Sequence, residues 1–196
     1  MKVIRNVNET LKDDLALELQ KGSMLSIVAA DFSMYAFEAL RKELSEIEEL
    51  RFIFTDPTFI QKENSKKEKR EFYIPKINRE RRIYGTEFEV KLRNELNQKA
   101  IAKECAEWIK KKVTFKFNVG NKEITDRFIV LNDIAYYTVN SFTTVDLGCE
   151  QGNNMGVNIL KLESPASQAF IEQFAKLWQN EEELKDVTNN VISSIS

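Results

Sequence analysis

The most informative absence in this 196-residue sequence is histidine, which occurs nowhere in the chain. Without histidine the chain alone cannot build a Ser-His-Asp or Cys-His nucleophilic site, because both need an imidazole as the proton acceptor. Histidine metal ligands and a phosphohistidine intermediate are excluded for the same reason. Any reaction performed within this chain would have to use carboxylates, hydroxyls, thiols or amines.

Cysteines, long apolar runs and a strong net charge are lacking too. Two cysteines, Cys105 and Cys149, are too few for a disulfide framework or a cysteine zinc site. No apolar run approaches the roughly 20 residues of a membrane span, and the N-terminus lacks the apolar core of a signal peptide. The net charge of −2 indicates no general attraction to nucleic acid. We therefore expect a cytoplasmic protein with no membrane contact and no cofactor, forming a single domain over 1–196.

Apolar periodicity predicts an α/β fold. A helical pattern lies between two short buried runs, which is typical of a βαβ unit with parallel strands. The expected strands are 24–30, 50–55, 113–117, 127–131, 135–139 and one within 153–162. The expected helices are a short one within the N-terminal segment 1–21, capped by Asn8 and running through Gln20, and those at 34–47, 86–112 and 166–179. These elements predict a mixed, mostly parallel sheet flanked by helices.

A basic segment interrupts this pattern at 61–82. It contains nine Lys or Arg against four Glu, a local charge of +5 in an acidic chain, with Phe72 and Tyr73 between the charges. Cations interleaved with aromatic residues are typical of surfaces that contact phosphates and stack on bases. The candidate nucleic-acid contacts are Lys66, Lys67, Lys69, Arg70, Lys76, Arg79, Arg81 and Arg82. The alternative is a solvated loop, which is the usual state of a charge run.

Glu89-Val90-Lys91 matches half of a metal-dependent nuclease signature, for which Asp56 would be the acidic partner. However, Thr86 precedes Glu89 by three residues, which is the spacing of a helix capping box. The capping interpretation is favoured, so no metal site is predicted.

The stretch "DRFIVLNDIAYYTVNSF" at 126–142 carries a second, more extended spacing. It resembles the phospholipase D pattern H-x-K-x(4)-D-x(6)-G-[GS] when Asp133 is placed at the aspartate. Asp126 then occupies the position of the nucleophilic histidine, and Phe128 that of the phosphate-binding lysine. Asn140 and Ser141 fall on the Gly-Ser pair. The alternative is that Asp126, Asp133 and Asn140 are only turn formers between strands.

The surrounding sequence is similar to the same superfamily over most of 22–180. "MLSIVAADFSMYAFEALRKELSEIEELRFIFT" resembles its first strand, helix and second strand, and "SFTTVDLGCEQGNN" resembles the segment after the motif. The resemblance implies a phospholipase D-like half-domain whose catalytic residues are absent, with Asp126, Asp133 and Ser141 around one depression at the strand ends. An acidic or aromatic residue at the two key positions supplies neither the nucleophile nor the positive charge.

The segments "YGTEFEVKLRNEL" and "AKECAEWIKKKV" resemble those of domains at the N-terminus of bacterial superfamily 2 helicases. This resemblance implies an accessory domain with the ATP-dependent helicase motor downstream in the same chain. It fits the absence of an ATP-binding P-loop pattern here.

Three functions remain open at this stage. The first is a catalytically inactive module that binds DNA for a helicase. The second is a protein-interaction or homodimerisation module without DNA affinity, because single-motif members of the superfamily pair two halves. The third, a metal-dependent nuclease, is the least favoured.

Overall fold

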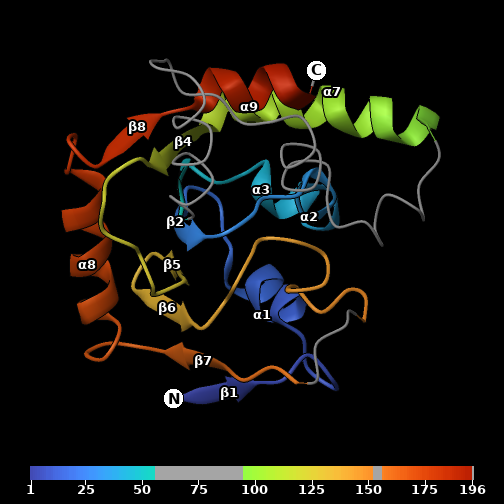
Figure 1. Ribbon diagram of the computed structural model, residues 1–196. Helices are drawn as coiled ribbons and strands as arrows, with labels where there is room; N and C mark the ends of the chain where they lie inside the picture. The colour runs from blue at the N-terminus through green and yellow to red at the C-terminus, as the bar shows by residue number, and fades with distance from the viewer. Residues whose placement is uncertain (56–94, 152–155, 196) are drawn as a thin grey trace.

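The computed structural model describes residues 1–55, 95–151 and 156–195. They form one eight-stranded sheet with helices on both faces (Figure 1). The strands are β1 (Lys2–Ile4), β2 (Met24–Ala29), β3 (Glu49–Phe54), β4 (Val113–Asn118), β5 (Phe128–Leu131), β6 (Ile134–Tyr137), β7 (Ile159–Leu162) and β8 (Leu184–Asp186). The helices are α1 (Leu11–Glu18), α2 (Met34–Ala39), α3 (Arg41–Leu44), α7 (Glu95–Lys112), α8 (Gln168–Trp178) and α9 (Thr188–Ile195).

The strands lie in the order β1-β7-β6-β5-β2-β3-β4-β8. The expected strands between residues 24 and 139 all lie in this sheet, as β2 to β6, and the α/β class is confirmed. The expectation of a mostly parallel sheet is wrong, because only β2–β3 and β3–β4 are parallel, while the other five pairs are antiparallel. The tight β5–β6 turn forces antiparallel pairing, and both edge strands also enter antiparallel.

Local sequence explains most element boundaries. The hydroxyl of Thr10 accepts the Asp13 N–H at 3.1 Å and caps α1, so the expected cap at Asn8 is wrong. Ser33 caps α2 in the same way. The helix expected over 34–47 is divided at Leu40, whose backbone leaves helical geometry with φ −118° and ψ 23°. The start of the helix expected at 86 lies outside the described residues.

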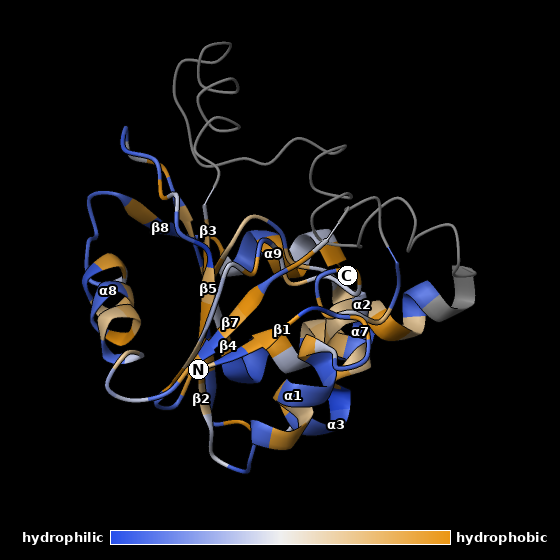
Figure 2. Cartoon of the chain, turned by 90° about the horizontal axis from the view of Figure 1, so that it is seen from below, coloured by the Kyte–Doolittle hydropathy of each residue, from blue (hydrophilic) through white to orange (hydrophobic). Residues whose placement is uncertain are grey.

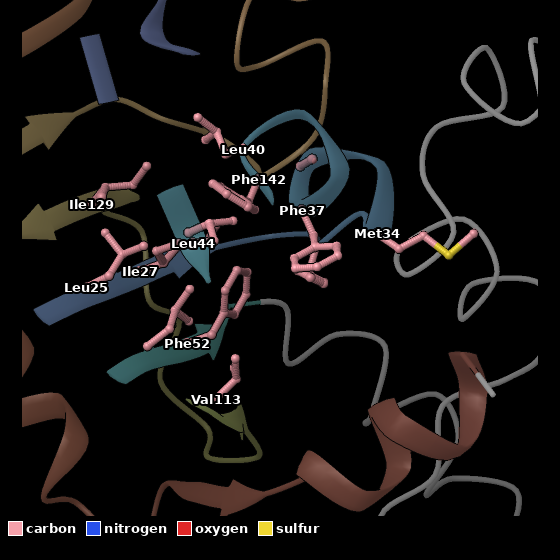
Figure 3. Close-up of a cluster of buried hydrophobic side chains, with 14 of the residues drawn as sticks. Leu25, Ile27, Met34, Phe37, Leu40, Leu44, Phe52, Val113, Ile129 and Phe142 are labelled. Carbon is pink, nitrogen blue, oxygen red and sulfur yellow. The ribbon is translucent and has the colours of Figure 1, made fainter. Parts of the chain in front are cut away.

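The main core lies on the face of the sheet covered by α1, α2, α3, α7 and α9 (Figure 2). Aliphatic and aromatic side chains from β2, β3 and α2 meet there, as Figure 3 shows for Ile27, Phe52 and Phe37. The indole N–H of Trp108 on α7 donates to the Leu44 carbonyl at 2.9 Å, which ties α7 to α3.

The opposite face is covered by α8 among the described helices, over a smaller cluster that includes Val28, Ile53 and Phe128 (Figure 2). Two cations lie beside the aromatic end of α8. The Arg51 guanidinium stacks 5.0 Å from the Phe174 ring centre, and the Lys116 ammonium lies 4.2 Å from that of Trp178. These cation–π contacts fasten α8 where the sheet surface is polar. No helix within the described ranges is long and apolar enough to cross a bilayer.

Candidate functional site

Polar side chains gather where the parallel strands β2 and β3 end. Because β5 begins and β6 ends at this edge of the sheet, residues from four chain segments meet there. Backbone hydrogen bonds join them: the Ala30 N–H donates to the Asn140 carbonyl at 3.0 Å, and the Phe142 N–H donates to the Asp31 carbonyl at 2.9 Å. In open α/β sheets, ligands bind outside the carboxyl ends of the strands. We call Asp31, Thr55, Arg127, Asn140 and Ser141 the strand-end cluster.

Arg127 is the cation of the strand-end cluster. Its Nη1 donates to the Asn140 Oδ1 at 2.6 Å, and its Nε donates to the Thr55 hydroxyl at 3.3 Å. Both acceptors are neutral, and Arg127 forms no ion pair with any residue in the described ranges. The guanidinium is therefore oriented by hydrogen bonds to neutral groups and forms no direct ion pair with a described carboxylate.

The remaining members of the strand-end cluster form a chain of weaker hydrogen bonds. Asn140 Nδ2 donates to the Ser141 hydroxyl at 3.4 Å, and that hydroxyl donates to Asp31 Oδ2 at 3.3 Å. These distances are at the long end for hydrogen bonds. One guanidinium and one carboxylate thus lie at the two ends of a neutral Asn–Ser bridge.

Asp126, the expected counterpart of the nucleophile, is not part of this series of hydrogen bonds. Its two carboxylate oxygens accept hydrogen bonds at 3.1 Å, one from the Tyr137 hydroxyl and one from the Gln173 amide of α8. The bond to Asp126 raises the pKa of Tyr137. The carboxylate therefore links β6 to α8.

The structure does not bring the five predicted motif positions together. Asn140 and Ser141 lie in the strand-end cluster, with Asp126 close in sequence to Arg127. Phe128 is fully buried and packs on Phe170 of α8, with ring centres 5.2 Å apart. Asp133 is exposed in the β5–β6 turn, at the far end of the hairpin. The expectation that Asp126, Asp133 and Ser141 surround one depression is wrong.

The β5–β6 hairpin also contains an extra residue at the end nearest the strand-end cluster. Phe128 pairs with Tyr137, but the N–H groups of Thr138 and Val139 both reach the Arg127 carbonyl, at 3.1 and 3.2 Å. Two residues therefore oppose one, which defines a β-bulge. The bulge lies directly before Asn140, whose Oδ1 accepts the Arg127 Nη1–H. Sequence analysis missed Arg127, although it is the single Lys or Arg between 123 and 160.

The other predicted positions lie outside the described residues. These are the eight candidate nucleic-acid contacts between Lys66 and Arg82, together with Asp56, Glu89 and Lys91. Within the described ranges, no group of three or more acidic or cysteine side chains is placed to hold a metal ion.

A second charged group lies in the interior and supports the fold. Asp14 of α1, 2% exposed, accepts hydrogen bonds from the Tyr136 hydroxyl at 2.6 Å and from the ammonium groups of Lys161 and Lys2 at 3.0 Å. Burial disfavours the Asp14 carboxylate, but these donors outweigh it and hold its pKa below the ordinary value. Burial and the Asp14 carboxylate raise the pKa of Tyr136. The group fastens α1 onto β6 and β7.

No protein-family model matches the chain, and no curated protein sequence matches it either. Among solved structures, it is similar to phosphatidylserine synthase of Haemophilus influenzae Rd KW20, with 14% sequence identity and a TM-score of 0.50. The match covers 94% of this chain and 38% of the synthase chain. That synthase is a phospholipase D superfamily member, and at this identity the similarity shows the fold alone: the chain has a phospholipase D-like fold.

Proposed function

We propose that this chain is a non-hydrolytic, phospholipase D-like accessory domain that binds the phosphate backbone of DNA for a helicase motor. The observation that carries the proposal is the Arg127 guanidinium, which lies at the strand ends with only neutral described partners. A guanidinium held by neutral acceptors keeps its charge available for an anionic ligand.

Charge distribution along the chain supports the same proposal. Segment 61–82 holds nine basic and four acidic residues, a net charge of +5. Because the net charge of the whole chain is −2, the remaining residues carry a net charge of −7. The sequence therefore concentrates positive charge in one segment, which follows Thr55 by a few residues. An acidic chain with one basic segment can bind phosphates through that segment without general attraction to polyanions.

The absence of hydrolysis follows from the chemistry of the available groups. No histidine exists, Asp126 is held by Tyr137 and Gln173, and a carboxylate near a phosphodiester repels it. The helicase context rests on the sequence resemblance described above. In that context a binding domain need only deliver the motor to DNA.

The test is DNA binding by fluorescence anisotropy between 50 and 200 mM salt. Each lost phosphate contact lowers the slope of log affinity against log salt by about 0.9 for duplex DNA. We expect Arg127→Gln to reduce the slope by about one contact. Reversal of Lys66, Lys67, Lys69 and Arg70 to Glu should reduce it by several. Arg5→Gln, which removes an exposed arginine beyond β1, is the matched control and should leave the slope unchanged.

Other results would favour other functions. A chain that fails to bind DNA at 50 mM salt but dimerises with rising concentration in sedimentation experiments would be an interaction module. DNA binding that is insensitive to both sets of substitutions would refute the assigned contacts. Metal-dependent cleavage lost on Glu89→Ala would indicate the nuclease.

A further inference from the structure

Thr138 has an unusual backbone conformation, with φ of +70°. Two other non-glycine residues in the described ranges have positive φ, and both are asparagines, which tolerate the left-handed region. Asn132 occupies the tight β5–β6 turn, where positive φ is required. A β-branched residue is disfavoured there, so Thr138 is held by its surroundings.

The strain coincides with the β-bulge opposite Arg127. One bulge type places a left-handed residue, normally glycine, at its first position, and Thr138 stands at that position. If β5 and β6 kept their regular register, Arg127 would face Thr138 alone and Asp126 would face Val139. The extra residue advances the chain by one position, so Asn140 lies opposite Asp126 instead of Thr125. From there the Asn140 Oδ1 accepts the Arg127 Nη1–H at 2.6 Å.

The Thr138 side chain shows what holds this conformation. Its hydroxyl donates to the Asn158 carbonyl at 2.5 Å, with the Tyr137 carbonyl at the same distance. Asn158 lies directly before β7, so the bond ties the bulge to the next strand. Glycine would relieve the strain but could not make this bond.

We infer that Thr138 is a positioning residue: its strained, hydrogen-bonded bulge holds the Arg127 guanidinium against Asn140 in the orientation that receives the anionic ligand. The inference rests on the proposed function for the identity of the ligand, a DNA phosphate. The positioning itself can be tested in the free protein, because the Arg127–Asn140 bond is made within the chain.

The first experiment measures that positioning without DNA. In ¹⁵N-labelled protein, the Nε–H signal of Arg127 is assigned by its loss in Arg127→Gln, and its heteronuclear NOE reports side-chain order. We expect Thr138→Gly to lower this NOE markedly, and Thr138→Ser, which keeps the hydroxyl, to preserve it. Asn132→Gly is the control, because it changes a positive-φ residue at the other end of the hairpin. Should Thr138→Gly fold poorly, Thr138→Asn tolerates the same φ and also loses the bond to Asn158.

An unchanged Arg127 NOE in a folded Thr138→Gly or Thr138→Asn protein would refute the inference, whatever DNA binding shows. The second experiment is a double-mutant cycle on DNA affinity. Thr138→Gly should weaken binding severalfold when Arg127 is present and have no effect in the Arg127→Gln background. Equal losses in both backgrounds would show that Thr138 does not act through Arg127. If Arg127→Gln itself leaves DNA affinity unchanged, the proposed function fails, while the NOE result still decides the positioning.

Discussion

Replacement of Asp14 by asparagine should be among the most damaging changes to this fold. The substitution keeps the shape of the side chain but removes the charge that compensates Lys161, itself 8% exposed. Lys161 would retain Glu18, at 3.2 Å, as its remaining carboxylate. Breaking one side of a buried ion pair costs about 3–5 kcal/mol. Because the introduced amide oxygen can still accept the Tyr136 hydroxyl, we expect the lower value, about 3 kcal/mol.

Urea unfolding at pH 7 measures this loss, with Asp13→Asn as the matched control. Asp13 is exposed in the first turn of the same helix, where its charge contributes only about 0.3–1 kcal/mol. The double variant Asp14→Asn with Lys161→Met removes both buried charges and should recover part of the lost stability. A loss below about 0.5 kcal/mol at pH 7, or no recovery in the double variant, would refute this account of the network.

The pH dependence follows from the lowered pKa of Asp14. A carboxyl whose pKa is lower in the folded protein stabilises it fully above the unfolded-state pKa, near 3.9. That stabilisation is lost as the pH falls through the folded-state pKa. The stability difference between the wild type and Asp14→Asn should therefore be constant from pH 5 to 8 and shrink below about pH 4. A difference that grows on acidification would contradict the assigned sign.

Three further predictions concern other parts of the molecule. Gly148→Ala should destabilise the fold by about 1–3 kcal/mol, because φ at this position is +84° and the added Cβ would lie 2.7 Å from the Asn6 Oδ1. Thermal melts measure this loss. The control Gly156→Ala should show no such loss, because its added Cβ meets no described atom within 4 Å. Cys149 is exposed, whereas burial raises the pKa of Cys105, so a thiol reagent should modify one cysteine in the native protein and both after unfolding. The purified chain should not hydrolyse DNA or an aryl phosphodiester with added metals, and turnover that survives repurification but is lost on Asp133→Ala would overturn this prediction.

The central strands could be predicted because their sequences are buried on both faces. β2 and β3 are short apolar runs, and nearly every residue in them is buried or half-buried. The edge strands β1 and β8 could not be predicted, because each has three residues and alternates only once between buried and exposed. α9 was missed because its apolar face, with Val191 and Ile195, is short and interrupted by polar residues.

Strand direction was predicted less well than strand position. The βαβ pattern determines the direction of β3 relative to β2, but it contains no information about strands joined by turns. The edge strands pair with elements far away in sequence, β1 with β7 and β8 with β4. Their orientation depends on tertiary packing, which local periodicity does not encode.

The candidate site shows what the spacing of motif residues along the sequence cannot predict. Counting positions along 126–141 identifies residues that match the pattern, but it does not describe how β5 and β6 pair. The bulge at Thr138 and Val139 is not visible in such a count, and the residue that contacts Asn140 is Arg127, the neighbour of the position matched to the lysine. A left-handed β-branched residue costs about 1–3 kcal/mol, so the bulge persists only because surrounding contacts, including the bond to Asn158, maintain it. The strained residue lies opposite Arg127 and two positions before Asn140, next to the contact that we infer it positions.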